Sequence, residues 1–298
     1  MRNIKLLSSF LFCIFIISCI KDIEDINVYY YSDEEYSIIS KNLDLPRDLD
    51  DFSVKLPQHL FFEDNFGDHQ FINHSMSTLG RVLFYDTRLS VSNEVSCASC
   101  HKQQFAFGDN VAFSAGVFDQ KTSRNSLSLA AAPNLAASYN SHVSRAAFGW
   151  DHANPESMSQ SKAALLNSAE MGNSDIQQIL QRLREDPVYP LLAKKAFGRD
   201  ILDEFVLLHS LDQFMNSITV FNTKFDEGLK ETPGFSAFPD FPNFTEEENI
   251  GKHLYLNHCA SCHGEKQDIQ VKQSGNNGLD LVYEDKGIGN IEGSHFYK

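Results

Sequence analysis

Two five-residue segments place cysteine and histidine at a spacing suited to holding a metal-containing group. The segments are Cys97-Ala98-Ser99-Cys100-His101 and Cys259-Ala260-Ser261-Cys262-His263. Within one helical turn the first cysteine, the second cysteine and the histidine face one side. Two thiols can then bond the vinyl groups of a haem while the imidazole binds its iron. We therefore expect two covalently attached c-type haems, with Cys97, Cys100, Cys259 and Cys262 as attachment points and His101 and His263 as axial iron ligands.

The alternative for this residue pattern is zinc, because pairs of cysteines separated by two residues also bind that ion. Each pair here carries its own adjacent histidine, which favours haem. The second axial position of each iron separates an electron carrier from a catalyst, since an open position admits a substrate. No His or Met lies between His101 and Arg124, but Met158 and Met171 follow later. The residues alone leave both functions open.

The first residues have the pattern of an export signal. Arg2 and Lys5 precede an apolar run over residues 6–17, and Ile16-Ile17-Ser18-Cys19 resembles the site at which bacterial lipoproteins are cut and acylated. The run is short for a membrane span. We expect residues 1–18 to be a signal peptide and residues 19–50 a tether anchored by lipid at Cys19. The protein would then lie in the periplasm or cell envelope, with membrane contact through the lipid only.

The charge of the chain is strongly negative. It is −15 in total, and removal of residues 1–18 makes it −17 because that segment carries two positive and no negative charges. Such a surface is a poor partner for nucleic acid and a better one for a small electron-donor protein with a basic patch. Of the six cysteines, four belong to the two motifs, Cys13 lies in the signal and Cys19 at the acylation site. No structural disulfide is expected.

The pattern along the chain is mainly helical. A weak internal repeat relates residues 79–85, before the first motif, to residues 250–255, before the second. Apolar periodicity and helix caps predict a helix over residues 77–84 and another that starts after Thr245. Between the two motifs they predict three helices: one from 176 to 186, a second that ends at Gly198, and a third over about 201–220. Residues 103–125 and 231–243 read as loops. We predict a mainly α protein with two cytochrome c-like domains, residues 51–224 and 225–298, each with one haem.

Six further segments, together with the first motif, suggest a family. The chain from about Gly80 onward resembles the bacterial di-haem cytochrome c peroxidases, a family that also includes the MauG-type di-haem oxidases. The resemblance rests on residues 80–90, Ser96 with residues 97–101, residues 107–109, Arg124-Asn125, Trp150-Asp151, Glu170-Met171 and residues 285–287.

The resemblance implies a peroxidase whose first haem reacts with hydrogen peroxide and whose second relays electrons. It implies that Glu170 handles the peroxide protons, that Gln160 lies in the same pocket, that Trp150 lies between the haems, and that Arg124 contributes to cofactor binding. Electrons would come from a small cytochrome c or a cupredoxin. The rival functions are a non-catalytic di-haem electron carrier, a MauG-like oxidase of a partner protein, and a haem-binding sensor. Calcium binding and a homodimer stay open.

Several positions depart from the family pattern. Val117 stands where many members carry a distal histidine, which indicates a first haem that is open without prior reduction. His152 replaces a glycine of the family pattern, and Asn134 lies only near the place of a calcium-linked asparagine, where this chain has Ala131. No Met follows His263, so we expect the chain to stop short of the family's C-terminal stretch. Tyr283, His295 and Tyr297 are the candidate ligands of the second iron.

Overall fold

The computed structural model describes residues 30–52, 72–130, 148–151, 153–154, 156–220, 222–264 and 282–287. The predictions for the signal peptide, Cys19, Ala131, Asn134, His152, His295 and Tyr297 lie outside these residues. The chain divides into two compact units, Met1–Leu49 and Asp50–Lys298, which are described separately below. The predicted boundary between residues 224 and 225 stays a prediction. No described helix has the length and hydropathy that a membrane span requires.

The first unit contains the helix α1 (Asp33–Ile39). Ser32 and Glu35 form a capping box: the Ser32 amide donates to the Glu35 carboxylate at 2.8 Å, and the Glu35 amide donates to the Ser32 hydroxyl at 3.2 Å. The chain then turns back, and the Tyr31 amide donates to the Arg47 carbonyl at 3.0 Å. The predicted tether over residues 19–50 therefore includes a helix, which its acidic and tyrosine-rich composition did not indicate.

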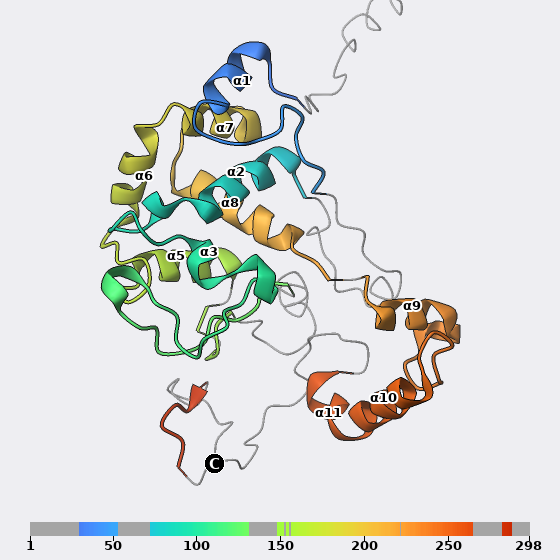
Figure 1. Cartoon of the computed structure of the whole chain (residues 1–298). Helices are drawn as coiled ribbons and strands as arrows, with labels where there is room; N and C mark the ends of the chain where they lie inside the picture. Colours follow the sequence, from blue (N-terminus) through green and yellow to red (C-terminus); the bar gives the residue numbers. More distant parts are fainter. Residues whose placement is uncertain are drawn as a thin grey trace, which may run out of the picture. The chain divides into compact units, whose positions relative to one another are not determined.

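The second unit is helical where it is described (Figure 1). Its described residues form no strand, only isolated bridges such as Lys102 with Gly108. This confirms a mainly α fold, and the predicted helices are present. The helices are α2 (His74–Tyr85), α3 (Cys97–Cys100), α5 (Ser157–Leu166), α6 (Ile176–Arg184), α7 (Val188–Phe197), α8 (Glu204–Ser217), α9 (Lys224–Glu231), α10 (Glu246–His258) and α11 (Ala260–His263), with short 3-10 turns η3 (Thr87–Leu89), η4 (Gln103–Phe105), η5 (Val117–Asp119) and η7 (Pro233–Phe235).

The centre of this unit is the packing of α2 on α8 (Figure 1). Leu79 and Leu83 of α2 are fully buried, as is expected for residues four apart on the apolar face of a helix. At Gly80 the two backbones come so close that an added Cβ atom would lie 1.9 Å from the Ser210 carbonyl oxygen. Glycine is therefore required here by space.

Gly80→Ala should lower the free energy of unfolding by about 1–3 kcal/mol, because a methyl group must push α2 and α8 apart. The matched control is Gly251→Ala, at the equivalent position of the internal repeat, where nothing lies within 4 Å of an added Cβ. That change should stabilise α10 by about 0.5–1 kcal/mol. Urea unfolding measures both, and equal gains at the two positions would contradict the packing described.

The turn after α2 is fixed by a partly buried polar network. Arg88 donates to both carboxylate oxygens of Asp86, with distances of 2.7 to 3.1 Å, and to Asp186 at 3.1 Å. The Tyr189 hydroxyl also donates to Asp86. Burial raises the pKa of Asp86, but the bonds from Arg88 and Tyr189 outweigh this and hold the pKa below its usual value. This network explains why the segment 86–88 leads the chain from α2 toward α3 in a defined direction.

Residues 223–264 have a small core of their own, formed by Leu229, Ala237 and Phe241. The capping box predicted at Thr245 is confirmed, with Glu248 as its partner at the start of α10. Lys252 of α10 is buried, its Nζ atom donates to the Ala237 carbonyl at 2.8 Å, and it lies 4.2 Å from the centre of the Phe241 ring. These contacts hold the predicted loop 231–243 against the helix that leads to the second motif.

Candidate haem and peroxide site

The first Cys-x-x-Cys-His segment folds as the single turn α3, as its spacing predicts. The Ser96 amide donates to the Ser99 hydroxyl at 3.0 Å, and the His101 amide donates to the Cys97 carbonyl at 2.9 Å. These bonds close the turn at both ends. The two thiols and the imidazole consequently reach the same side of the chain.

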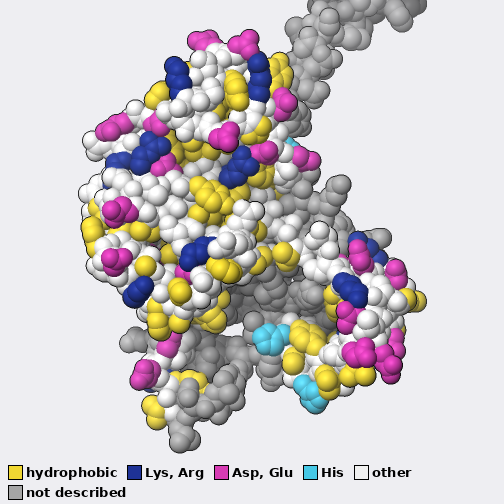
Figure 2. All heavy atoms as spheres, viewed as in Figure 1, with side chains coloured by type: hydrophobic (Ala, Val, Ile, Leu, Met, Phe, Trp, Pro, Cys, Tyr) yellow, Lys and Arg dark blue, Asp and Glu magenta, His cyan; other side chains and the backbone are white. Residues whose placement is uncertain are grey.

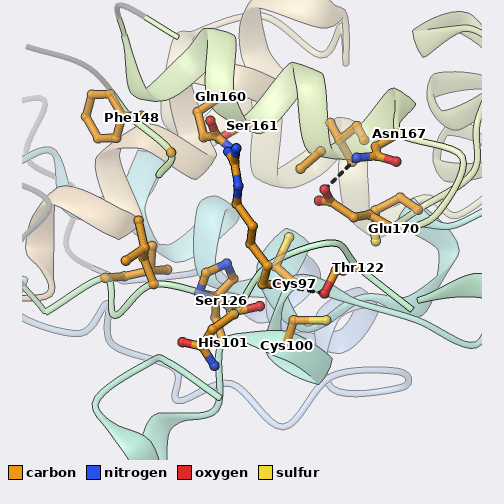
Figure 3. A pocket seen from close by; sticks show the side chains of 18 of the residues that line it. Cys97, Cys100, His101, Thr122, Ser126, Phe148, Gln160, Ser161, Asn167 and Glu170 are labelled. Atoms are coloured by element: carbon orange, nitrogen blue, oxygen red, sulfur yellow. Dashed lines mark hydrogen bonds between the residues drawn. The ribbon is translucent and has the colours of Figure 1, made fainter. Parts of the chain in front are cut away.

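That side borders a cavity of about 390 Å³ (Figure 3), a volume within the usual range of small-molecule sites. The cavity also receives residues from α5, α8, the loop after η5 and the turn before α6. All seven residues predicted for the first site line it: Cys97, Cys100, His101, Arg124, Trp150, Gln160 and Glu170. Their presence around one cavity is a geometric finding, while their individual roles stay predictions.

His101 is held by a backbone carbonyl. Its Nδ1 atom lies 2.8 Å from the Phe107 oxygen, a bond that the Nδ1–H tautomer makes by donating. Burial lowers the pKa of His101, although the carbonyls of Phe107 and Leu127 oppose the shift, so the ring is neutral at physiological pH. Iron-binding histidines commonly donate their other ring N–H to a carbonyl in this way. Nε2 is then the nitrogen left to bind iron.

The turn that supplies this carbonyl is unusual. Ala106 and Phe107 have φ values of 54° and 58°, a left-handed conformation that residues with a Cβ rarely adopt. Asp109 stabilises the turn by accepting bonds from Lys102 at 2.6 Å and Ser114 at 2.5 Å. Strained backbone that is held in this way is frequent at functional sites. Here it aims the Phe107 oxygen at His101.

The two thiols of the motif are protonated. Burial raises the pKa of Cys97 to about 12 and also raises that of Cys100, and the negative charge of Glu170 adds to both shifts. The Glu170 carboxylate is thus close enough to the attachment thiols for its field to act on them. Two thiols and one imidazole beside a single cavity fit covalent haem.

Glu170 lies in a turn between α5 and α6. Asn167 orients it by donating from Nδ2 to Oε1 at 2.7 Å, a bond drawn in Figure 3. The Asn167 side-chain oxygen also accepts the Ala169 amide at 2.9 Å, which is an Asx turn. Burial raises the pKa of Glu170, and the Asn167 bond opposes the rise only in part. A raised pKa makes the carboxylate a stronger base than an exposed glutamate, which favours a function in proton transfer.

Glu170→Gln should raise the free energy of unfolding at neutral pH, because the folded protein pays a desolvation cost for the ionised carboxylate. A carboxyl group whose pKa is higher in the folded protein than in the unfolded chain stabilises the folded state at low pH. This stabilisation is lost as the pH rises through the folded pKa. The gain should therefore shrink on acidification. Urea unfolding at about pH 8 and about pH 4 measures it, and a gain that is equal at both pH values would contradict the raised pKa.

The other cavity residues are held by neighbouring polar groups. The Gln160 oxygen accepts from Asn154 at 2.7 Å, and the Trp150 ring nitrogen donates to the Asn125 carbonyl at 2.8 Å. Trp150 is 52% exposed, so it is not simply a packing residue of the core. Arg124 pairs with Asp151 at 2.8 Å and with Asp285 at 2.6 Å. The carboxylates raise the pKa of Arg124, which keeps its positive charge at the edge of the cavity.

Val117 does not line the cavity. It is buried, and an added Cβ on Gly172 would lie 2.7 Å from its side chain, so the valine packs behind the Glu170 turn. An aliphatic side chain offers no ligand to iron, but the prediction of an open first haem is not tested by this packing. Met171 and Met215 do line the cavity, whereas Met158 does not.

The second motif follows directly from α10. Cys259 and His263 are exposed, and the Tyr255 hydroxyl donates to the Gly264 carbonyl at 2.9 Å. Gly264 has a φ of 80°, which a glycine adopts at no cost and which ends the helix. The Cys262 side chain is not among those that the structure describes. The second site is therefore described by its backbone and by the side chains of Cys259 and His263.

Sequence reasoning missed Asn167 and Asn173. Asn167 could have been found, because an asparagine whose side chain bonds the backbone two residues on is a common turn signal. Asn173 gives no such signal, since it bonds backbone carbonyls outside its own turn, one of them, Leu89, 84 residues away in the sequence.

Comparison with known proteins points to one family. The family model described as di-haem cytochrome c peroxidase matches residues 74–233, which is more than half of the chain. The match includes the first motif and all the cavity residues predicted from sequence. It ends before Cys259, so the second motif is supported by the sequence pattern and the internal repeat.

The individual relatives include both cytochrome c peroxidases and MauG proteins. The chain is 28% identical over 197 residues to cytochrome-c peroxidase IdrP2 of Pseudomonas sp. (strain SCT), covering 64% of this chain and 48% of that protein. It is 26% identical over 218 residues to the methylamine utilization protein MauG of Paracoccus denitrificans, covering 67% and 54%. The chain thus spans about half the length of these relatives.

Among solved structures, a MauG-like protein associated with microbial copper homeostasis is similar, with a TM-score of 0.59 and 24% identity. The similarity covers 85% of this chain and 71% of that one. At this identity the similarity supports the fold, which is helical in its described parts and of the di-haem peroxidase type.

Proposed function

Because the chain belongs to the di-haem cytochrome c peroxidase family, we propose that it is an exported di-haem peroxidase that reduces hydrogen peroxide to water with electrons from a small redox protein. One observation carries the proposal. A half-buried carboxylate, Glu170, lines the same cavity as the complete haem-binding segment, Cys97 to His101. A simple electron carrier has no use for such a carboxylate.

The residues of the first site would hold the haem as follows. Cys97 and Cys100 form thioether bonds to its vinyl groups, and His101 binds its iron with an imidazole oriented by Phe107. When bound, haem supplies an iron that can bind peroxide and exchange electrons. Cys259, Cys262 and His263 hold the second haem in the same manner, since their spacing is identical.

Glu170 would carry protons during the reaction. Its carboxylate takes the proton from the inner oxygen of peroxide and returns it to the outer oxygen, which leaves as water when the O–O bond breaks. Two electrons and two further protons complete the conversion of one peroxide to two waters. The raised pKa of Glu170 suits the first of these transfers, because it makes the carboxylate a stronger base for taking the proton from peroxide. Gln160 adds a second polar group to the cavity wall.

The surface charge supports a basic electron donor. The first turn of α10 carries Glu246, Glu247 and Glu248, all exposed, and Figure 2 shows acidic side chains gathered over α9 and α10. A small cytochrome c or cupredoxin with a basic patch would be attracted to such a surface. The lipoprotein-like residues 16–19 support a location in the periplasm or cell envelope, with the anchor at Cys19.

A spectroscopic titration tests the function. Protein matured with covalent haem is mixed with hydrogen peroxide, first fully oxidised and then after one-electron reduction. We expect a high-spin haem that reacts at once in the oxidised protein and steady peroxide consumption when a reduced donor is added. Two low-spin haems that do not react in either state would refute the proposal.

Met171 favours an electron carrier as the second candidate, because it is buried and lines the cavity, where its sulfur could ligate iron. Met171→Leu decides between them. For a peroxidase with an open site, the spectrum of the oxidised protein should not change. For a carrier, the loss of a sulfur ligand should convert one haem from low to high spin.

The similarity to MauG proteins supports a third candidate, an oxidase of a partner protein. Such an enzyme would keep its oxidised state for a long time after peroxide addition and would show little turnover with small donor proteins. The titration above distinguishes this outcome by the decay of the spectrum.

A further inference from the structure

The turn that presents Glu170 ends at a buried asparagine, Asn173, which is 2% exposed. Its Nδ2 atom donates to the Leu89 carbonyl at 2.8 Å and to the Leu165 carbonyl at 2.9 Å. Leu89 belongs to η3 and Leu165 to the last turn of α5. One side chain thus joins the Glu170 turn to two elements that are far apart in the sequence.

The oxygen of Asn173 is bound by an arginine. Arg182 of α6 donates to it from Nη2 at 2.5 Å, and the Arg182 Nε atom donates to the Arg88 carbonyl at 3.0 Å. No carboxylate of the described residues forms an ion pair with Arg182. Burial lowers its pKa. Burying part of a cation whose hydrogen-bond partners are neutral oxygens costs free energy. This cost indicates that the position of these oxygens matters.

The opposite side of the Glu170 turn is held by a backbone hydrogen bond and by close packing. The Val117 amide donates to the Glu170 carbonyl at 2.9 Å, and an added Cβ on Gly116 would lie 2.0 Å from the Ala169 oxygen. The turn is therefore in direct contact with the loop around η5 and has no room to shift that way. Two further contacts fix the turn: the Val91 amide donates to the Met171 carbonyl at 2.9 Å, and the Asn173 side chain anchors its end.

We propose that Arg182 and Asn173 are positioning residues for Glu170: Arg182 fixes the Asn173 amide, and Asn173 fixes the turn that places the Glu170 carboxylate at the cavity. The proposal rests on the proposed function for its effect on catalysis, and on geometry alone for its effect on the turn.

The test compares Arg182→Leu with Arg184→Leu in the haem-loaded protein. Arg184 is the matched control, because it lies on the same helix and donates from Nε to the Leu202 carbonyl at 2.8 Å, away from the Glu170 turn. Arg182→Leu should slow the reaction with peroxide about 10- to 100-fold, since small misplacements of a catalytic group have effects of this size. Arg184→Leu should leave the rate unchanged.

Two further readouts separate positioning from a general loss of stability. Amide hydrogen exchange of residues 167–173 should quicken in Arg182→Leu and not in Arg184→Leu. In an E170Q background, measured at higher peroxide concentration, Arg182→Leu should cause no further loss of rate, because residues that act through one group are not additive.

The outcomes are distinct. An equal fold-loss of rate with and without E170Q, or unchanged exchange of the turn, would overturn the proposal. If the parent protein does not react with peroxide, the proposed function fails, and the exchange measurement still decides whether Arg182 holds the turn.

Discussion

Glu170→Gln should slow the reaction of the haem-loaded protein with hydrogen peroxide about 10²- to 10⁴-fold, the range that general acid–base groups contribute. Glutamine keeps the size of the side chain and can still accept the 2.7 Å bond from Asn167. It can neither take a proton from peroxide nor return one. The cavity and the haem-binding turn should therefore be unchanged while the proton transfer is lost.

Stopped-flow mixing with peroxide measures this rate, and the visible spectrum before mixing checks that both haems are in place. Glu185→Gln is the control, because it removes the same charge from an exposed position at the end of α6. It should keep the parent rate. A Glu170→Gln protein with the parent rate would show that another group moves the protons.

The pH dependence follows from the same residue. Peroxide arrives with its proton, so Glu170 must be ionised to accept it, and the rate should fall on acidification through the folded pKa of Glu170. Because burial raises this pKa, the fall should begin at a higher pH than for an exposed glutamate. This acid limb should be absent from the residual rate of Glu170→Gln.

The helices were predictable because their signals are local. The apolar spacing of Ile176, Ile179 and Leu183 marks α6, and all three residues are buried as expected. The Thr245 cap gives the start of α10 in the same way. Helix α1 escaped prediction because an acidic, tyrosine-rich segment has no apolar periodicity, although the Ser32 and Glu35 capping box was present in the sequence.

The first site was only partly predictable. Periodicity and spacing indicated the haem-binding turn, but nothing local relates Arg124, Trp150 and Glu170 to it. The family resemblance singled these residues out, and the structure places them on one cavity. Asn173 and Arg182 could not be found by either route, because the oxygens that they bind have positions that depend on the whole fold.

The second large effect concerns the attachment of haem. Replacing Cys97 and Cys100 together by alanine should reduce the covalent haem content from about two per chain to about one, because thioether bonds need both thiols of the pair. His101 remains, but an imidazole alone holds haem reversibly. Pyridine haemochrome spectra and intact mass measure the loss, and the rapid reaction with peroxide should disappear with it.

Replacing Cys259 and Cys262 is the matched change at the other motif. It should also leave about one haem per chain, but the first haem, with Glu170 beside it, should still react with peroxide at the parent rate while turnover with a donor protein falls. The two pairs are thereby assigned different functions although their sequences are identical. If both variants lose the peroxide reaction equally, the reactive site is not confined to the cavity of Cys97.

The folded structure also limits when this attachment can occur. Burial raises the pKa of Cys97 to about 12, so its thiol is protonated and a poor nucleophile in the folded protein. Haem added to the folded, haem-free protein should therefore attach more slowly than haem added in urea, where the thiol has its ordinary pKa. Equal rates would mean that the cavity opens freely. A slower rate in the folded protein would place attachment before the packing of α3 against α2.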